Sequence, residues 1–217
     1  MSHVAGDARD LRALELDSGE LAFPDGWADL SLFSPPYLNC IDYSEIYKLE
    51  LWLMEHVVSV ESFRSTRRGT LRSHPSVRFS QTVHFPKGGS RSTDLAEGLE
   101  DWLTTESRRK ADGVVVRQYF EDMFKVFQEQ FRLLRAGGLV VCVVANPTFS
   151  RRERGEKDPG WQELWRLPVL TDVLLAHFAL EIGFSDVEVV SARDLRPKNV
   201  KGGMAREALV VARKGRA

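Results

Sequence analysis

A run of seven apolar residues, Leu139–Ala145, constrains the fold of this 217-residue chain more than any other stretch. Turn residues bound the run, with Gly137-Gly138 before it and Asn146-Pro147 after it. A continuous apolar run of this length, rich in valine, indicates a strand that is buried on both faces. Such strands are typical of parallel sheets whose two faces are both covered. The sequence therefore predicts an α/β fold built on a parallel sheet.

Helices and further strands are expected around this run. Aromatic and aliphatic residues from Tyr119 to Leu134 recur at helical spacing, which predicts a long core-facing helix ended by Gly137-Gly138. A charged loop is expected over Arg151–Pro159, then a helix over Leu167–Ile182 that Gly183 caps. The last two strands are expected at Val187–Val190 and Ala208–Ala212, as a closing antiparallel hairpin.

The first strand is expected at Ala28–Phe33, and it runs directly into Ser34-Pro35-Pro36-Tyr37. Proline lacks a backbone donor and restricts the residue before it, so the strand ends here and the turn is stiff. Ligands of open α/β sheets bind outside the carboxyl ends of the strands. The turn therefore delivers a hydroxyl, a carbonyl and an aromatic ring to a candidate active site.

The rest of the N-terminal region is less regular. A turn at Gly6–Arg9 opens a weakly helical segment to Leu16, and Leu38–Tyr43 reads as irregular. Ser44 stands where a helix N-cap would, ahead of apolar residues at helical spacing that continue to about Val57. Residues 60–112 read as an insertion, with a helical stub, a long loop and a second helix; the core is expected in residues 1–59 and 113–217.

Composition excludes several classes of function. A net charge of −1 gives no overall preference for nucleic acid or membrane, and the two cysteines and five histidines have no metal-ligand spacing. No leader with a basic and then an apolar part is visible, and the longest apolar run is too short to span a bilayer. A cytoplasmic protein without a metal site is expected.

Several of these features resemble one family. Ser34-Pro35-Pro36-Tyr37 resembles motif IV of the DNA methyltransferases that methylate exocyclic amines, where Asp, Asn or Ser precedes Pro-Pro and an aromatic residue. Gly6-Asp7-Ala8 is similar to the acidic turn that contacts the cofactor adenine in this family, and Leu133–Leu139 to its transition from helix through Gly-Gly to strand. The terminal strands resemble the antiparallel pair that closes a class I methyltransferase sheet.

The resemblance implies a partial class I, Rossmann-like fold and an S-adenosylmethionine-dependent DNA methyltransferase, as found in restriction–modification systems. Ser34 and the Pro35 carbonyl would accept hydrogen bonds from the target amine, Pro36 would keep the turn rigid, and Tyr37 would stack on a base swung out of the duplex. Serine at the first position of the motif favours cytosine N4 over adenine N6. Asp7 and Ala8 would contact the cofactor, although a turn or cap role for Asp7 is equally open.

One part of the family's pattern is missing from this sequence. The Gly-rich turn after the first strand, typically Phe-x-Gly-x-Gly, has no match, nor has the acidic residue that holds the ribose. The chain resembles the half of a methyltransferase that begins just before motif IV. A second chain that carries the cofactor half, a fragment and a degenerate remnant are the open alternatives.

Candidate DNA contacts lie in three places. Just past the motif are Asn39, Asp42 and Tyr43, of which Asp42 is equally suited to cap the next helix. The arginines of the insertion, Arg64, Arg67, Arg68 and Arg72, could follow phosphates, and Arg151 and Arg152 form a second patch. Two other functions stay open: a DNA-recognition module without catalysis, and methylation of an RNA or protein amide nitrogen.

Overall fold

A four-stranded sheet is the framework of the computed structural model, which describes residues 7–14, 23–76, 84–85, 89–107, 109–154, 160–193 and 206–216. Its strand order is β1-β2-β6-β5, and the bounds are β1 Ala28–Phe33, β2 Leu134–Ala145, β5 Phe184–Arg193 and β6 Glu207–Lys214. β1 is parallel to β2, and β6 is antiparallel to both of its neighbours, so β1, β2 and β5 run in one direction. The predicted fold class is confirmed: an α/β fold with a partial Rossmann-like sheet and a closing antiparallel hairpin.

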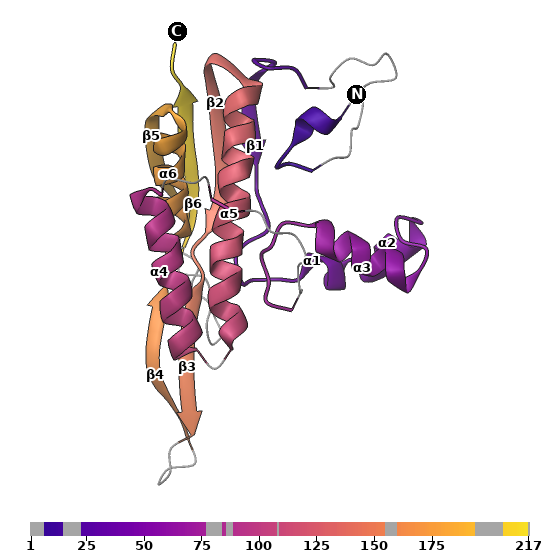
Figure 1. Ribbon diagram of the computed structural model, residues 1–217, viewed down its shortest axis with the longest axis vertical. Coiled ribbons are helices and arrows are strands. Elements are labelled where there is room, and N and C mark those ends of the chain that lie inside the picture. The colour runs from indigo at the N-terminus through magenta and orange to yellow at the C-terminus, as the bar shows by residue number, and fades with distance from the viewer. Residues whose placement is uncertain are drawn as a thin grey trace.

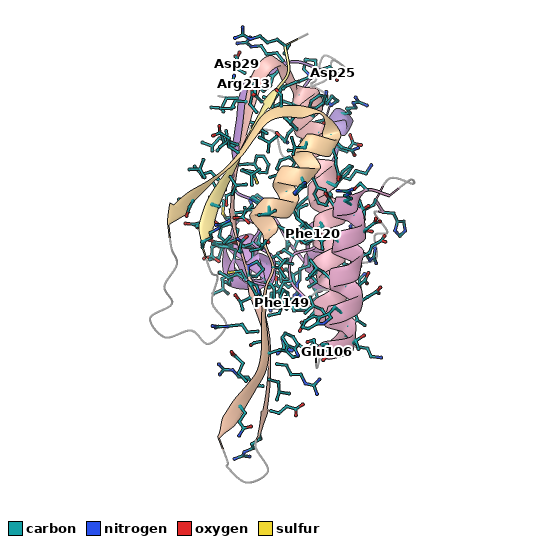
Figure 2. The ribbon with its side chains drawn as sticks, turned by 90° about the vertical axis from the view of Figure 1, so that its left-hand side faces the viewer. Asp25, Asp29, Glu106, Phe120, Phe149 and Arg213 are labelled. Carbon is teal, nitrogen blue, oxygen red and sulfur yellow. The ribbon has the colours of Figure 1, made fainter. Side chains whose placement is uncertain are left out.

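Three helices lie on one side of this sheet (Figures 1 and 2). They are α4 (Arg91–Glu106), α5 (Lys110–Leu133) and α6 (Thr171–Ile182). The apolar stripe of α5 is buried as predicted, since Phe120 and Phe127 are fully buried. Phe178 of α6 packs edge-on against Phe120, with ring centroids 6.0 Å apart. The core therefore lies between the helices and one face of the sheet.

The other face of β2 departs from the prediction that both faces are buried. Val140, Cys142 and Val144 are fully buried against the helices. Leu139, Val141 and Val143, which alternate with them, are only partly buried. The reason is that all three helices packed on the sheet lie on one side of it, so the described residues cover one apolar face and not the other.

The transition from α5 to β2 also differs from the prediction. α5 ends at Leu133 and β2 begins at Leu134, so Gly137 and Gly138 lie inside the strand and do not end the helix. The carbonyls of Phe131 and Leu134 accept hydrogen bonds from the Lys214 ammonium, at 2.7 and 2.8 Å. A lysine from a distant strand thus satisfies carbonyls at the helix end, a role that the sequence assigned to glycine.

A second, two-stranded sheet replaces the predicted charged loop. β3 (Thr148–Arg154) pairs with the antiparallel β4 (Trp161–Pro168), and residues 155–159 lie outside the described part. The prediction of a helix from Leu167 is wrong at its start, because Leu167 pairs with Phe149 in this hairpin and α6 begins at Thr171. The helix does end as predicted, at Gly183 with φ 113°.

Three short helices project from the β1 side of the sheet (Figure 1). They are α1 (Tyr43–Ile46), α2 (Lys48–Leu53) and α3 (Val60–Gly69). Asp42, not Ser44, is the N-cap of α1, since its carboxylate accepts from the Glu45 N–H at 3.3 Å. A 3-10 turn, Leu11–Ala13, is what the structure shows of the predicted N-terminal helical segment, and residues 15–22 lie outside the described part.

Residues 60–112, the predicted insertion, hold α3 and α4, and the division of the chain at residues 59/60 and 112/113 stays a prediction. Of the helices in the described part of the chain, none is long and apolar enough to cross a membrane.

Candidate active site

The Ser34 turn lies at the carboxyl end of the outermost strand of the sheet. Phe33, the last residue of β1, pairs with Cys142 of β2, and Ser34 follows it directly. Ser34 is exposed, and its hydroxyl donates to the Val143 carbonyl at 3.2 Å. A serine hydroxyl has one proton and two lone pairs. Because Val143 takes the proton, the oxygen of Ser34 is left as an acceptor for an incoming donor.

Tyr37 is held from the far end of the sequence. Its phenol donates to the Glu207 carboxylate at 2.7 Å, and Glu207 is the first residue of β6, opposite Ala145. Burial raises the pKa of Tyr37, and the hydrogen bond to Glu207 adds to the shift, while the neighbouring Ser34 hydroxyl opposes it in part. Tyr37 therefore stays protonated at neutral pH, with its ring edge anchored. Sequence reasoning missed Glu207, because nothing local to it signals a contact 170 residues away.

A buried polar network supports the same edge of the sheet. The side-chain amide of Asn146 donates to the Asp172 carboxylate at 2.9 Å, and its side-chain oxygen Oδ1 accepts from the backbone N–H of Asp172 at 3.1 Å. Arg206 binds the other Asp172 oxygen at 2.5 Å, and its backbone carbonyl accepts from the Asn146 N–H at 3.1 Å. The network fixes the start of β6, next to Glu207. The sequence did not reveal it, since its members come from three separate segments.

Asp42 links α1 to α3. Its carboxylate accepts from Ser44, Ser76 and Arg67, each at 2.5 Å. Burial raises the pKa of Asp42, but these hydrogen bonds and the Arg67 charge outweigh it and lower the pKa to about 2. The contacts are those of the capping role that the sequence left open, and a DNA contact by Asp42 stays a prediction.

Asn39 lies between the turn and α1, and Tyr43 is the first residue of α1. Asn39 has φ 52°, in the left-handed region, and its N–H donates to the Ser73 carbonyl at 2.7 Å. Tyr43 is exposed and stacks on Tyr47, with ring centroids 6.5 Å apart. A small cavity of about 70 Å³ lies here, lined by Pro36, Asp42, Tyr43, Ser44, Thr70, Leu71, Ser73 and His74. The segment after the motif is thus tied to residues 70–76.

The arginines predicted to contact phosphates fall into different environments. Arg64 and Arg68 of α3 are exposed, whereas Arg67 is half-buried against Asp42 and Glu45. Arg72 corrects the prediction, because it is 1% exposed and pairs with the fully buried Asp122 at 2.8 Å. A guanidinium enclosed in this way has no surface to offer a phosphate.

The second predicted patch lies on β3, and both of its arginines have partners. Arg151 pairs with Glu153 at 2.6 Å and donates to the Glu106 carbonyl at 3.1 Å. Arg152 pairs with Glu163 of β4 at 3.2 Å. Both side chains are partly exposed. The patch is therefore charge-balanced by acids on its own hairpin.

Asp7 and Ala8, the predicted cofactor contacts, lie in the N-terminal turn. The Asp7 carboxylate accepts from the backbone N–H of Arg9 at 2.9 Å and from its guanidinium at 2.6 Å. Arg9 in turn reaches Asp122 of α5 at 3.1 Å. Beside this turn is an open cavity of about 510 Å³, lined by Asp7, Arg9, Asp10, Arg12, Lys125, Gln128, Glu129 and Arg132.

These residues do not form a complete site for S-adenosylmethionine. The Asp7 oxygens already accept three hydrogen bonds from Arg9 that are shorter than 3.0 Å. The two strands whose carboxyl ends lie at the Ser34 turn are β1 and β2, and they are followed by Ser-Pro-Pro-Tyr and Asn-Pro. Neither connection has the glycines that let a backbone approach a cofactor closely. The N-terminal turn is held instead by Arg9, which ties it to α5 and to the end of α3.

Comparison with known proteins gives two kinds of similarity. No family model matches the chain. The Type II methyltransferase M.AvaI, from Nostoc sp. (strain PCC 7120) and from Anabaena variabilis, is 26% identical over 171 residues, which cover 75% of this chain and 32% of the relative. The chain thus spans about a third of the length of these curated relatives.

Among solved structures, a DNA modification methylase from Thermus thermophilus, complexed with S-adenosyl-L-methionine, aligns with a TM-score of 0.43 at 15% identity. The alignment covers 98% of this chain and 52% of that one. A selenomethionine derivative of the same methylase aligns with a TM-score of 0.42. On the sequence match alone, the chain has weak homology to a Type II DNA methyltransferase.

Proposed function

We propose that this chain forms the amine-binding side of the active site of an S-adenosylmethionine-dependent DNA methyltransferase, with cytosine N4 preferred over adenine N6. The observation that carries the proposal is the exposed Ser34 hydroxyl, which donates its proton to the Val143 carbonyl. The rigid turn Pro35-Pro36-Tyr37 follows directly. The weak homology to a Type II methyltransferase supports it.

The chemistry explains why such a turn is needed. An exocyclic base amine is a poor nucleophile, because its lone pair is delocalised into the ring. Acceptors at Ser34 Oγ and the Pro35 carbonyl would hold the amine protons and turn the lone pair away from the ring. Preorganised acceptors of this kind act without reorganisation at the moment of reaction. S-adenosylmethionine would supply the methyl group, and we propose that a polypeptide outside this sequence binds it.

Tyr37 would present the face of its ring to the extruded base. The bond from its phenol to Glu207 fixes one edge of the ring, so the ring is oriented before the base arrives. Enzymes that act on a base take it out of the stack and hold it against aromatic side chains. Asn39 and Tyr43, just past the turn, would contact the base or its backbone.

DNA would be bound along α3. The exposed Arg64 and Arg68 are the best placed of the predicted contacts, with Arg67 behind them. The partly exposed Arg151 and Arg152 would be a second contact, weakened by their paired glutamates. Phosphate contacts of this kind make DNA binding sensitive to salt.

Labelled methyl transfer tests the catalytic proposal. The full chain, together with a protein that binds S-adenosylmethionine, is incubated with unmodified DNA and methyl-labelled cofactor, and the methylated base is identified by mass spectrometry. Ser34→Ala should lower transfer by about 100-fold or more, the usual cost of removing one preorganised group. The product should be N4-methylcytosine.

Ser185→Ala is the matched control. Its hydroxyl also donates to a backbone carbonyl at 3.2 Å, that of Arg213, but at the start of β5. This variant should keep full transfer. If transfer stays unchanged in both Ser34→Ala and Tyr37→Ala, the role assigned to the turn is wrong.

A DNA-recognition module without catalysis is the second candidate, favoured by the exposed arginines of α3. Salt-sensitive DNA binding without methyl transfer, in the presence of every S-adenosylmethionine-binding protein encoded beside this chain, would favour the module.

A further inference from the structure

One face of the four-stranded sheet is largely apolar and has no helix packed on it among the described residues. Ser31 of β1 bonds to Gln130 of α5, and Phe33 packs on Phe127 of α5. Side chains alternate between faces along a strand. Leu30 and Leu32 therefore point away from α5, and they are 55% and 66% exposed.

The register of the strands extends this surface across the sheet. Residues paired directly across a ladder point to the same face. The ladders place the charged residues Arg213, opposite Leu139, and Glu188, opposite Val211, on this face as well. Starting from β1, the apolar ladder partners on the face are Leu30 with Leu139, Leu32 with Val141, Val141 with Val211, Val143 with Leu209, and Leu209 with Val190. We call these eight residues the open face. Figure 2 shows the helices on the opposite side of the sheet.

Exposed apolar side chains continue on the β1 side of the molecule. β1 is one of the two edge strands, so one of its edges has no ladder partner in the described sheet. The projecting helices α1 and α2, with the residue that follows them, expose Leu49, Leu53 and Met54 at 73%, 83% and 67%. Exposed apolar side chains gathered on one side of a molecule are typical of an interaction site.

We infer that the open face and the free edge of β1 bind the polypeptide that carries the methyl-donor half of the site. This inference rests on the proposed function. Ser34 follows an edge strand of the sheet. The part of the active site that faces Ser34 across the free edge of β1 must therefore come from another polypeptide segment. The sequence match covers 32% of M.AvaI, so about two thirds of that relative lie outside the match.

A second copy of this chain fits the site less well. Two copies joined through the β1 edge would be related by a two-fold axis, and their β1 strands would run antiparallel. The two Ser34 turns would then lie at opposite ends of the interface, and neither would have residues of the other copy opposite it. The partner is instead a polypeptide with a strand parallel to β1 and an amphipathic helix whose apolar stripe covers the open face.

Site-specific cross-linking tests the surface. A photoreactive phenylalanine analogue replaces Leu32 in the full chain, expressed in its native host, and the cross-linked protein is identified and purified. The expected partner binds S-adenosylmethionine in calorimetry, and its cross-linked peptide is apolar. A photoreactive residue in place of Leu180, 52% exposed on α6, is the control and should not capture it.

The purified partner then allows a quantitative test. Leu32→Asp should weaken the complex at least 100-fold, while Leu180→Asp should leave its affinity unchanged, with both variants folded by circular dichroism. A cross-link to a second copy of this chain, no cross-link, or equal affinity of the Leu32→Asp variant would overturn the inference.

The inference and the proposed function fail differently. If the complex forms through the open face but transfers no methyl group to DNA, the proposed function is wrong and the surface stands. If labelled methyl transfer proceeds with Leu32→Asp as with wild type, the function stands and the surface is wrong.

Discussion

At the residue scale, the charged groups around the candidate site are held in paired arrangements that fix neighbouring segments. Asp122 of α5 accepts from Arg9 at 3.1 Å and from Arg72 at 2.8 Å. Arg9 also donates to the Gly69 carbonyl at the end of α3. One buried carboxylate thus joins the N-terminal turn and the segment after α3 to the core. Removing one partner of such a group leaves an uncompensated buried charge.

The pH dependence of stability should report on Asp42. The pKa of this carboxyl is about 2 in the folded protein against an ordinary 3.8, so its ionised form stabilises the fold. The contribution is complete above about pH 5 and is lost as the pH falls from 4 towards 2. Asp42→Asn should lower the free energy of unfolding by on the order of 1 kcal/mol at pH 7, because water screens part of this site. Urea denaturation from pH 7 to pH 3 measures the difference, which should shrink with acid.

Asp186→Asn is the control for this titration. Asp186 is also an acid beside an arginine, but its side chain is 74% exposed and lies 3.8 Å from Arg213. Exposed pairs contribute little, so its unfolding free energy should stay near wild type. A difference for Asp42→Asn that grows on acidification would contradict the assigned pKa shift.

At the scale of elements, the contact between α4 and α5 depends on a glycine. A Cβ on Gly113 of α5 would lie 2.3 Å from the Thr104 hydroxyl and 2.4 Å from the Glu100 carbonyl oxygen. Both atoms belong to α4, and the carbonyl is backbone that cannot rotate away. The two helices therefore approach most closely where the side chain is absent. This contact holds α4, part of the predicted insertion, against the core.

Gly113→Ala should therefore destabilise the protein by about 1–3 kcal/mol, the usual cost of forcing an extra carbon into a packed interface. Gly98→Ala is the matched control, since Gly98 lies within α4 with no atom within 4 Å of its added Cβ. Alanine is the better helix former, so this variant should gain about 0.5–1 kcal/mol. Thermal and urea unfolding measure both changes. Equal changes in the unfolding free energy for the two substitutions would show that α4 and α5 accommodate the extra carbon without losing stability.

At the scale of the whole molecule, an apolar surface and a group of exposed arginines both lie on the β1 side. Most of the exposed large apolar side chains of the described residues lie between Trp27 and Val60, on β1 and the projecting helices. The exposed arginines of α3 lie on the same projection. We propose that this side of the molecule meets both the DNA and the methyl-donor half.

The salt dependence of DNA affinity should show whether the arginines of α3 contact phosphates. Arg64→Ala and Arg68→Ala should each weaken binding at all sequences and reduce the slope of log affinity against log salt by about 1, as expected for one lost phosphate contact. Fluorescence anisotropy at several salt concentrations measures the slopes. Arg91→Ala, an exposed arginine at the start of α4, is the control and should leave the slope unchanged. Unaltered slopes for both α3 variants would remove α3 from the DNA interface.

Several elements could be predicted from the sequence because their signals are local. The apolar run at Leu139–Ala145, the stripe of α5 and the Pro-Pro turn after β1 each follow from residues adjacent in the chain, and the structure has each in nearly its predicted place. The resemblance of the Ser34 turn to motif IV also rests on four consecutive residues. Such features need no knowledge of what packs against them.

Contacts between residues far apart in the chain become visible only in the folded protein. The bond of Tyr37 to Glu207 spans 170 residues, and that of Arg72 to Asp122 spans 50, so neither partner carries a local signal. The β3–β4 hairpin was missed because charged residues on an exposed ribbon read as a loop. The apolar pattern of β2 predicts two buried faces, but burial depends on which elements pack against the strand. Among the described residues, helices cover one face of β2, and we propose that a partner covers the other.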